Sequence, residues 1–163
     1  MRSDLVRLVK VLIVLLGVTL LGEANASSDD YETVVTMAKA NGFKPTHRVV
    51  KAIVLASRLY HIDVAELTAI AIVETGLGLY AVNRVNKNGT IDKGLFQINT
   101  VNEVYCKAFN LDTEEGSALC AAKLLHRIKK RHSDYLGRYH SKTPSLKSKY
   151  MHKVTSVMVK GMK

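Results

Sequence analysis

A single glutamate follows a largely apolar run near the middle of the chain. The run extends from Leu67 to Val73, and Glu74 comes directly after it. Because water stabilises the charged form of a carboxyl group, an apolar surrounding should raise the pKa of Glu74. A carboxyl group that keeps its proton near neutral pH can act as a general acid. Glu74 is therefore the candidate catalytic residue.

The residues around this glutamate predict the helix that positions it. Asp63 and Glu66 have the spacing of a capping box, which predicts a helix from Val64. Gly76 is a typical residue just past a helix end, so the helix should stop at about Thr75. Since this segment is apolar nearly all round, we expect other helices to bury it. Glu74 would then lie in its last turn, at the edge of the core.

The remaining sequence predicts a mainly helical domain with one small hairpin. Asn88-Gly89 is a strong signal for a two-residue turn, so a β-hairpin is expected within 82–91. Capping residues and apolar periodicity predict the other helices. The first of these begins at Asp29 or Asp30 and ends at Ala40. The others cover 47–60, 100–109, 112–132 and the chain from Thr143-Pro144 onward.

Three separated blocks resemble the bacterial lytic transglycosylases, which cleave the glycan strands of peptidoglycan. The blocks are Ala71-Ile72-Val73-Glu74-Thr75, Ala81-Val82-Asn83 with Asn88-Gly89-Thr90-Ile91-Asp92, and Gly94-Leu95-Phe96-Gln97-Ile98-Asn99. Tyr139-His140-Ser141, Thr143-Pro144 and Tyr150 further resemble small members associated with secretion, conjugation or pilus machinery. The resemblance implies one lysozyme-like α+β domain over 27–163, with its core at about 45–155.

The resemblance also implies a reaction and a role for the glutamate. In that family one Glu protonates the leaving oxygen of the β-1,4 bond between MurNAc and GlcNAc. It then removes a proton from the muramic acid 6-hydroxyl, which closes a 1,6-anhydro ring without any cofactor. By matching position, this role falls on Glu74.

Five further residues are candidates for substrate binding. Gln97 carries an amide that can both donate and accept hydrogen bonds to sugar groups. Asn99 has the same chemistry, but it could instead start the following helix. Tyr139 matches a family tyrosine near the catalytic Glu, and we expect it either to bond Glu74 or to be a core residue with a satisfied hydroxyl. The five candidates are Thr75, Asn83, Gln97, Asn99 and Tyr139.

The N-terminus has the pattern of a signal peptide. Arg2, Arg7 and Lys10 precede the apolar run 11–21, and Ala24-Asn25-Ala26 has small residues typical of a cleavage site. We therefore expect residues 1–26 to be removed on export to the periplasm or beyond, without a stable membrane anchor. In such an oxidising compartment the two cysteines, Cys106 and Cys120, should form a disulfide rather than remain buried thiols.

A net charge of +10 favours anionic partners, among which the carboxylates of the cell wall fit an exported chain best. Nucleic acid is disfavoured, because no aromatic residues interleave with the basic ones to stack on bases. We expect those basic residues to form a solvated helix face. They are Lys123, Arg127, Lys130 and Arg131. The six histidines have no spacing typical of metal ligands, so no metal site is expected.

Two other functions are open on the sequence. A lysozyme-type muramidase would use Glu74 as the acid and Asp92 as a second carboxylate, at about 5 Å as nucleophile or about 6.5 to 9.5 Å to activate water. A noncatalytic wall-binding scaffold would keep the same surface and cleave nothing. The products of wall digestion distinguish these alternatives from a transglycosylase.

Overall fold

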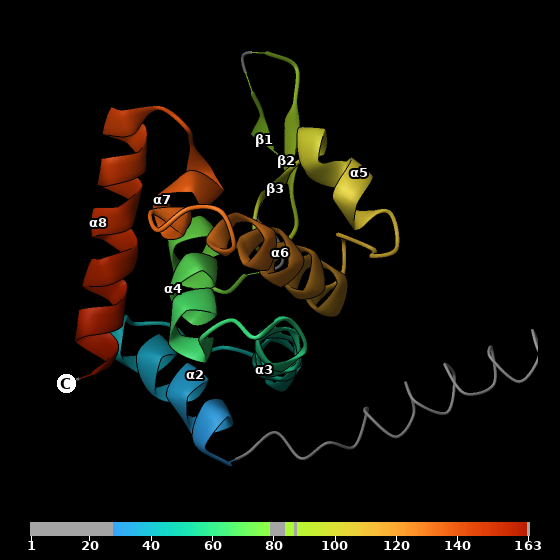
Figure 1. The fold of residues 1–163 in the computed structure, drawn as a ribbon. Coiled ribbons are helices and arrows are strands. Elements are labelled where there is room, and N and C mark those ends of the chain that lie inside the picture. Colours follow the sequence, from blue (N-terminus) through green and yellow to red (C-terminus); the bar gives the residue numbers. More distant parts are fainter. Residues whose placement is uncertain (1–27, 79–83, 87, 163) are drawn as a thin grey trace, which may run out of the picture.

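The computed structural model describes residues 28–78, 84–86 and 88–162. Within them the chain is mainly helical with a small antiparallel sheet, which confirms the predicted fold class at this level (Figure 1). The helices are α2 (Ser28–Ala40), α3 (His47–Tyr60), α4 (Val64–Thr75), α5 (Glu103–Cys106), α6 (Glu114–Lys129), α7 (Tyr135–His140) and α8 (Pro144–Gly161), with a 3-10 turn η1 (Thr100–Asn102). None of the helices described is long and apolar enough to cross a membrane.

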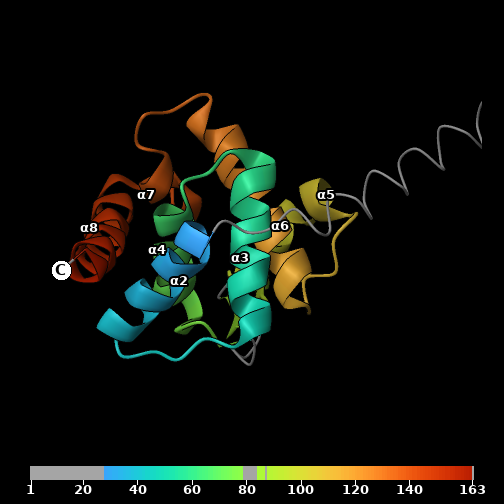
Figure 2. The same ribbon diagram turned by 90° about the horizontal axis from the view of Figure 1, so that it is seen from below.

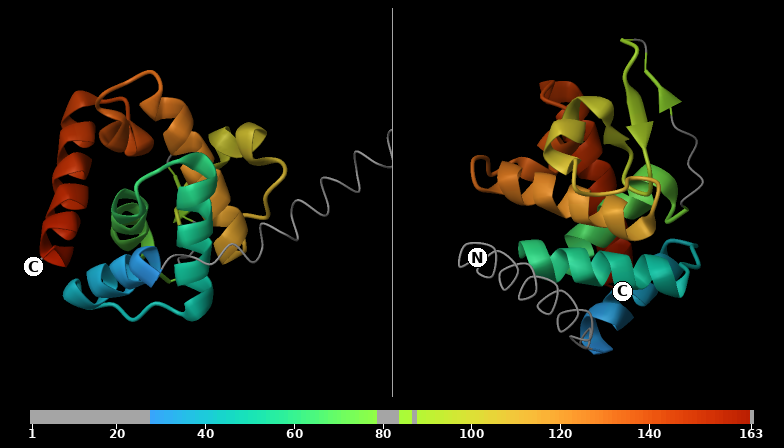
Figure 3. Two further views of the ribbon diagram at one scale, coloured as in Figure 1. Left: turned by 60° about the horizontal axis from the view of Figure 1, so that its bottom comes forward. Right: turned by 90° about the vertical axis from the view of Figure 1, so that its right-hand side faces the viewer.

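Helix α4 lies at the centre of the molecule. Residues Leu67 to Ile72 are all buried, and α2, α3 and α8 pack directly on the helix. Viewed from below, these helices enclose α4 (Figure 2). In the left panel of Figure 3, α2, α3, α6, α7 and α8 form a ring around it. The predicted burial of this helix is confirmed.

Local signals determine where the central helices begin and end. The Thr46 side chain accepts a hydrogen bond from the Val49 N–H at the start of α3. The Asp63 carboxylate accepts from the N–H groups of Ala65 and Glu66 at the start of α4. Gly76 ends α4 in the left-handed region, at φ 63°. These side-chain bonds satisfy backbone donors that have no partner inside the helix.

The sheet extends beyond the helices on one side (Figure 3, right). Strands β1 (Arg84–Val85) and β2 (Ile91–Lys93) form the predicted antiparallel hairpin. A third strand, β3 (Ile98–Asn99), pairs antiparallel with β2, which places Asp92 opposite Asn99. The hairpin prediction is confirmed, and β3 extends it. The predicted two-residue turn is wrong, because Val85 pairs with Ile91 and the Asn86 N–H donates to the Thr90 carbonyl, so the turn is longer than Asn88-Gly89.

Some predicted helix boundaries are wrong. Asn99, not Thr100, caps the chain after the sheet, because its side chain accepts from the Val101 N–H. The helix expected over 100–109 is reduced to η1 and the four-residue α5. Helix α6 is capped by Thr113 rather than Asp112 and ends at Lys129.

Two further differences concern the surface and the C-terminal region. The apolar periodicity that predicts the helices over 47–60 and from Thr143-Pro144 onward also places Leu59 and Leu146 on apolar faces, but these side chains are exposed at 53% and 46%. The short helix α7 was not predicted. Its Asp134 carboxylate pairs with Arg138 on α7 and with Lys147 on α8. The hydrogen bonds from Lys147 and Arg138 lower the pKa of Asp134 to about 2, so these pairs persist in mild acid and attach α7 to α8.

The predicted disulfide is confirmed. Cys106, the last residue of α5, is bonded to Cys120 on α6. An isolated helix of four residues is not stable in water, since helix nucleation is costly. The disulfide therefore attaches α5 to the much longer α6.

Gly94 occupies a position that only glycine fits. Its φ is 70°, and a Cβ built there would lie 2.2 Å from the Leu111 carbonyl oxygen. A side chain would therefore combine backbone strain with a collision against the main chain before α6. This close approach fixes the segment that follows the sheet against the helices.

We expect Gly94→Ala to lower the free energy of unfolding by more than about 2 kcal/mol, because strain and collision add. Gly89→Ala is the matched control, since Gly89 has φ 78° but nothing within 4 Å of a built Cβ. It should cost only about 1 kcal/mol. Urea unfolding monitored by circular dichroism measures both, and equal losses would contradict the packing explanation.

Candidate functional site

Glu74 lies in the last turn of α4, half-buried where the helix leaves the core. The Oη of Tyr150, on α8, donates a hydrogen bond to Glu74 Oε1 at 2.6 Å. Tyr150 itself is buried. The carboxyl group therefore has one oxygen held by a phenol that the core keeps in place.

Tyr139 is a core residue rather than a direct partner of the glutamate. Its Oη donates to the carbonyl oxygen of Phe96 at 2.9 Å. Of the two alternatives stated for Tyr139, the structure gives the satisfied core hydroxyl. Its ring still packs against that of Tyr150, with centroids 6.5 Å apart and planes tilted by 26°.

Both phenols are kept in their neutral form. Burial raises the pKa of Tyr150, and the Glu74 carboxylate raises it further. The pKa of Tyr139 is raised well above its ordinary value by burial, then by the charges of Glu74 and Asp92. At neutral pH each hydroxyl is consequently a hydrogen-bond donor, and Oε1 of Glu74 must be the acceptor.

His140 completes the aromatic surroundings of Tyr150. The two rings are parallel, with centroids 4.7 Å apart. Burial lowers the pKa of His140, and the nearby Lys153 charge lowers it further, whereas Asp92 acts in the opposite direction. His140 is therefore neutral at pH 7, and its stacking restricts the orientation of the tyrosine ring.

Thr75 connects the end of α4 to the segment after β2. Its Oγ1 donates to the carbonyl oxygen of Leu95 at 2.8 Å and lies 3.2 Å from that of Ala71. The Phe96 N–H donates to Oγ of the buried Ser117 on α6 at 3.1 Å. Together with the Tyr139 bond, these contacts hold the segment beside Glu74 from three helices.

Gln97 forms a tight turn within the same segment. Its φ is 47°, its backbone N–H donates to the Gly94 carbonyl, and its side-chain Nε2 donates to that same oxygen at 3.0 Å. The Gln97 amide, which was predicted to contact sugar, therefore also stabilises the turn from Gly94 to Gln97. A left-handed residue at this point directs the chain from the buried Phe96 into β3.

Asp92 lies on β2 within a network of amides. Its Oδ1 accepts from Asn99 Nδ2 at 2.7 Å, and its Oδ2 accepts from Asn86 Nδ2 at 3.1 Å. Asn99 Nδ2 also bonds Oγ1 of Thr90, while its Oδ1 caps η1. In this structure Asn99 therefore positions Asp92 and starts the next turn.

The structure brings Glu74, Thr75 and Tyr139 together and adds Tyr150, while Gln97 and Asn99 belong to the segment and sheet beside them. Asn83 lies outside the described residues. Within 28–78, 84–86 and 88–162, no group of three or more His, Cys, Asp or Glu side chains could hold a metal ion. Glu74 is a carboxyl group that can donate or accept a proton at the end of α4.

Sequence analysis did not identify Tyr150 as the residue bonded to Glu74. Tyr150 was noted for its part in the family resemblance, and apolar periodicity also places it on one face of α8, where Tyr150 and Val154 are buried. Its position on that face places the ring in the core, where the hydroxyl group needs a hydrogen-bond acceptor. The rule that a buried hydroxyl group is hydrogen-bonded predicts that Tyr150 has an acceptor, but it does not specify that the acceptor is Glu74.

A scan against protein-family models found no match, and searches of curated proteins and of solved structures found no similar protein.

We expect Tyr139 and Tyr150 to remain protonated while the protein is folded, even at pH 11, where an ordinary tyrosine is mostly ionised. Spectrophotometric alkaline titration should thus give the same phenolate signal below about pH 11 for the wild type and for Tyr139→Phe with Tyr150→Phe. Because folding raises both pKa values, the stability that they contribute is present below about pH 10 and declines above it. A smaller signal from the folded double variant would contradict this.

Proposed function

We propose that the protein is a peptidoglycan lytic transglycosylase with Glu74 as its acid and base. The observation that carries the proposal is a carboxyl group at the end of a buried helix, held by a buried neutral phenol 2.6 Å away. The resemblance of the blocks around Glu74, Gln97 and Tyr139 adds the substrate, a MurNAc–GlcNAc β-1,4 bond. A lysozyme-like relation of helices and sheet is part of the same proposal.

The first step transfers a proton from Glu74 to the leaving glycosidic oxygen. Because Tyr150 donates to Oε1, the proton on Glu74 is placed on Oε2. Transfer of that proton lets the bond break while positive charge develops on the sugar ring. The Tyr150 phenol then still donates to the carboxylate formed, which stabilises it.

In the second step the same carboxylate acts as a base. It removes the proton of the muramic acid 6-hydroxyl, whose oxygen attacks the anomeric carbon and closes the 1,6-anhydro ring. The proton returns to Glu74, so the group is ready for another turnover. One carboxyl group suffices, because the nucleophile is supplied by the substrate and not by water.

The surrounding residues position this group. Thr75 fixes the helix end against Leu95, and Tyr139 fixes Phe96 on the other side of the same segment. Gln97 lies just beyond, and its amide oxygen is the group proposed to accept from N-acetyl or hydroxyl groups of the glycan, while Asn99 positions Asp92. We propose export to the periplasm or beyond, and action at the wall beside secretion, conjugation or pilus machinery.

A muramidase is the second candidate, and one observation favours it. Both oxygens of Asp92 accept amide hydrogen bonds, and its charge acts on Tyr139 together with that of Glu74. A carboxylate held in fixed orientation near the acid is what a hydrolase requires. In that reaction Asn99 would serve by positioning Asp92.

Glu74→Gln tests the role of the acid. The variant keeps the size of the side chain and can still accept from Tyr150, but it has no acidic proton to give. We expect the release of anhydro-muropeptides from purified wall to fall about 100- to 10,000-fold. Mass spectrometry of the soluble products measures this, and wild-type release by the variant would refute the proposal. No release by the wild type itself would favour the scaffold.

Asp92→Asn separates the two enzymes. A transglycosylase should keep its activity within about threefold and form anhydro ends, because Asp92 takes no part in the chemistry. A muramidase should form reducing ends and lose at least about 100-fold. Because an amide at this position faces two amide donors, circular dichroism must first show that the variant is folded.

A further inference from the structure

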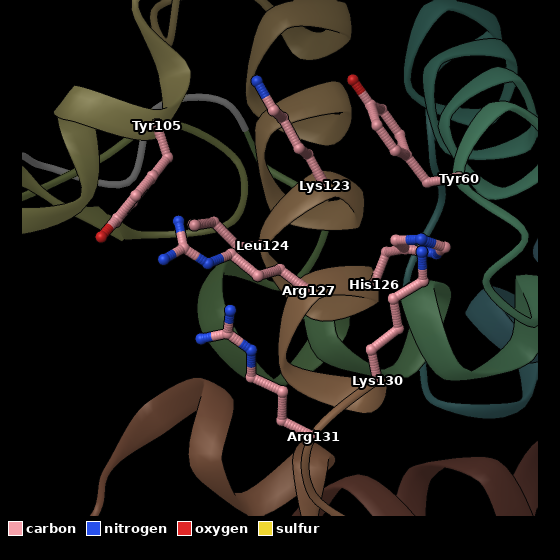
Figure 4. Close-up of a pocket in the computed structure, with 8 residues that line it drawn as sticks. All are labelled: Tyr60, Tyr105, Lys123, Leu124, His126, Arg127, Lys130 and Arg131. Carbon is pink, nitrogen blue, oxygen red and sulfur yellow. The ribbon is translucent and has the colours of Figure 1, made fainter.

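The outer face of α6 borders a concave site separate from the Glu74 region. A cavity of about 390 Å³ lies between the end of α3, α5 and α6. Tyr60 and Tyr105 flank it, and cationic side chains extend from α6 between them (Figure 4). The cationic residues are Lys123, Arg127, Lys130 and Arg131. None of the described residues that line the cavity is acidic.

Lys123, Arg127, Lys130 and Arg131 are all exposed, so the predicted solvated basic face is confirmed. Lys129 is not part of this group, and its Nζ lies 3.4 Å from Glu66 Oε2 and above the Tyr135 ring. The Arg127 guanidinium lies over the Tyr105 ring, 3.9 Å from its centroid. Figure 4 shows Arg127 and Arg131 extending toward the Tyr105 side and Lys130 toward the Tyr60 side.

We propose that this basic groove binds an acidic segment of a partner polypeptide. Lys123 and Arg127 are four residues apart on α6, so their positions rise by about 6 Å along the helix axis, and Arg131 follows in the turn just past the end of α6. In an extended chain, alternate side chains recur every 6.6 Å or so on one face. A segment with acidic residues at alternate positions therefore matches the spacing of Lys123 and Arg127, and a third acidic residue can reach Arg131.

The side chains suit carboxylates in particular. An arginine fork binds both oxygens of a carboxylate, and two arginines are next to each other in the row. Stacking on Tyr105 holds Arg127 in place before binding, so less side-chain entropy is lost on association. Four clustered cations without an acidic neighbour in the groove repel one another, and a bound polyanion relieves that repulsion.

Other anions fit this shape less well. Arg127 already covers one face of Tyr105, which leaves that face unavailable for stacking on a nucleic-acid base. The cations lie in a concavity between helices, whereas a flat bilayer touches the rim first. A single phosphate would engage one arginine pair and leave the rest of the row unused.

The test is fluorescence anisotropy of the full chain with the labelled peptide Gly-Glu-Ser-Glu-Ser-Glu-Gly at low salt. We expect Arg127→Glu with Arg131→Glu to weaken binding at least tenfold. The matched control, Lys149→Glu with Lys160→Glu on exposed positions of α8, changes net charge equally and should weaken binding less than twofold. Circular dichroism verifies that all variants are folded, as expected for substitutions of exposed residues.

Two further comparisons sharpen the result. Glu74→Gln should bind the peptide as the wild type does, so failure of the proposed enzyme leaves this site unaffected. Arg127→Lys with Arg131→Lys, which keeps the charge but loses the forks, should bind with an intermediate affinity.

Three outcomes would overturn the proposal. The first is an equal loss in the α6 and α8 variants, which means attraction by net charge alone. The second is tighter binding, with the same dependence on Arg127 and Arg131, to a single-stranded oligonucleotide or to vesicles containing phosphatidylglycerol. The third is complete displacement of the peptide by inorganic phosphate at equal ionic strength, which means a site for a single small anion.

Discussion

Helix α4 is apolar on nearly every side, so it can be stable only where other helices cover it. Its residues Leu67 to Ile72 are buried, and each large aliphatic side chain among them gains about 1.5 to 3 kcal/mol from leaving water. The chain meets this requirement with α2, α3 and α8 packed around the helix. A helix covered in this way can present charged groups only at its ends. Asp63 caps one end, and Glu74 is placed at the other.

Four hydroxyl groups determine the geometry around the C-terminal end of α4, where Glu74 lies. Those of Thr75, Ser117, Tyr139 and Tyr150 come from α4, α6, α7 and α8, and each binds either Glu74 or the segment from Leu95 to Phe96. A single such bond contributes about 0.5 to 1.5 kcal/mol to stability. Their joint effect is positional, because the segment cannot move without breaking bonds to several helices at once.

The features that sequence predicts well depend on near neighbours in the chain. Thr46, Asp63 and Gly76 act on the backbone within a few residues, and the hairpin indicated by Asn88-Gly89 is equally local. The position of Glu74 followed from the same local helix together with its apolar character.

The contacts that sequence did not predict join distant residues. Tyr150 lies 76 positions from Glu74, and either of two tyrosines near the C-terminus could have filled that role on chemical grounds. Whether Asn99 contacts substrate or Asp92 depends on the register of β2 and β3, which the sequence pattern does not specify. Thr113 and Asp112 have similar preferences for the N-cap position, so the sequence does not determine which of them begins α6.

The Cys106–Cys120 bond has a consequence for the basic groove. Tyr105 precedes Cys106, so the wall of the groove that carries its ring is attached to α6 by that covalent link. A reducing cytosol would leave the four residues of α5 without this attachment, and the ring would lose its fixed place beneath Arg127. The groove is therefore expected to be fully assembled only in the oxidised protein.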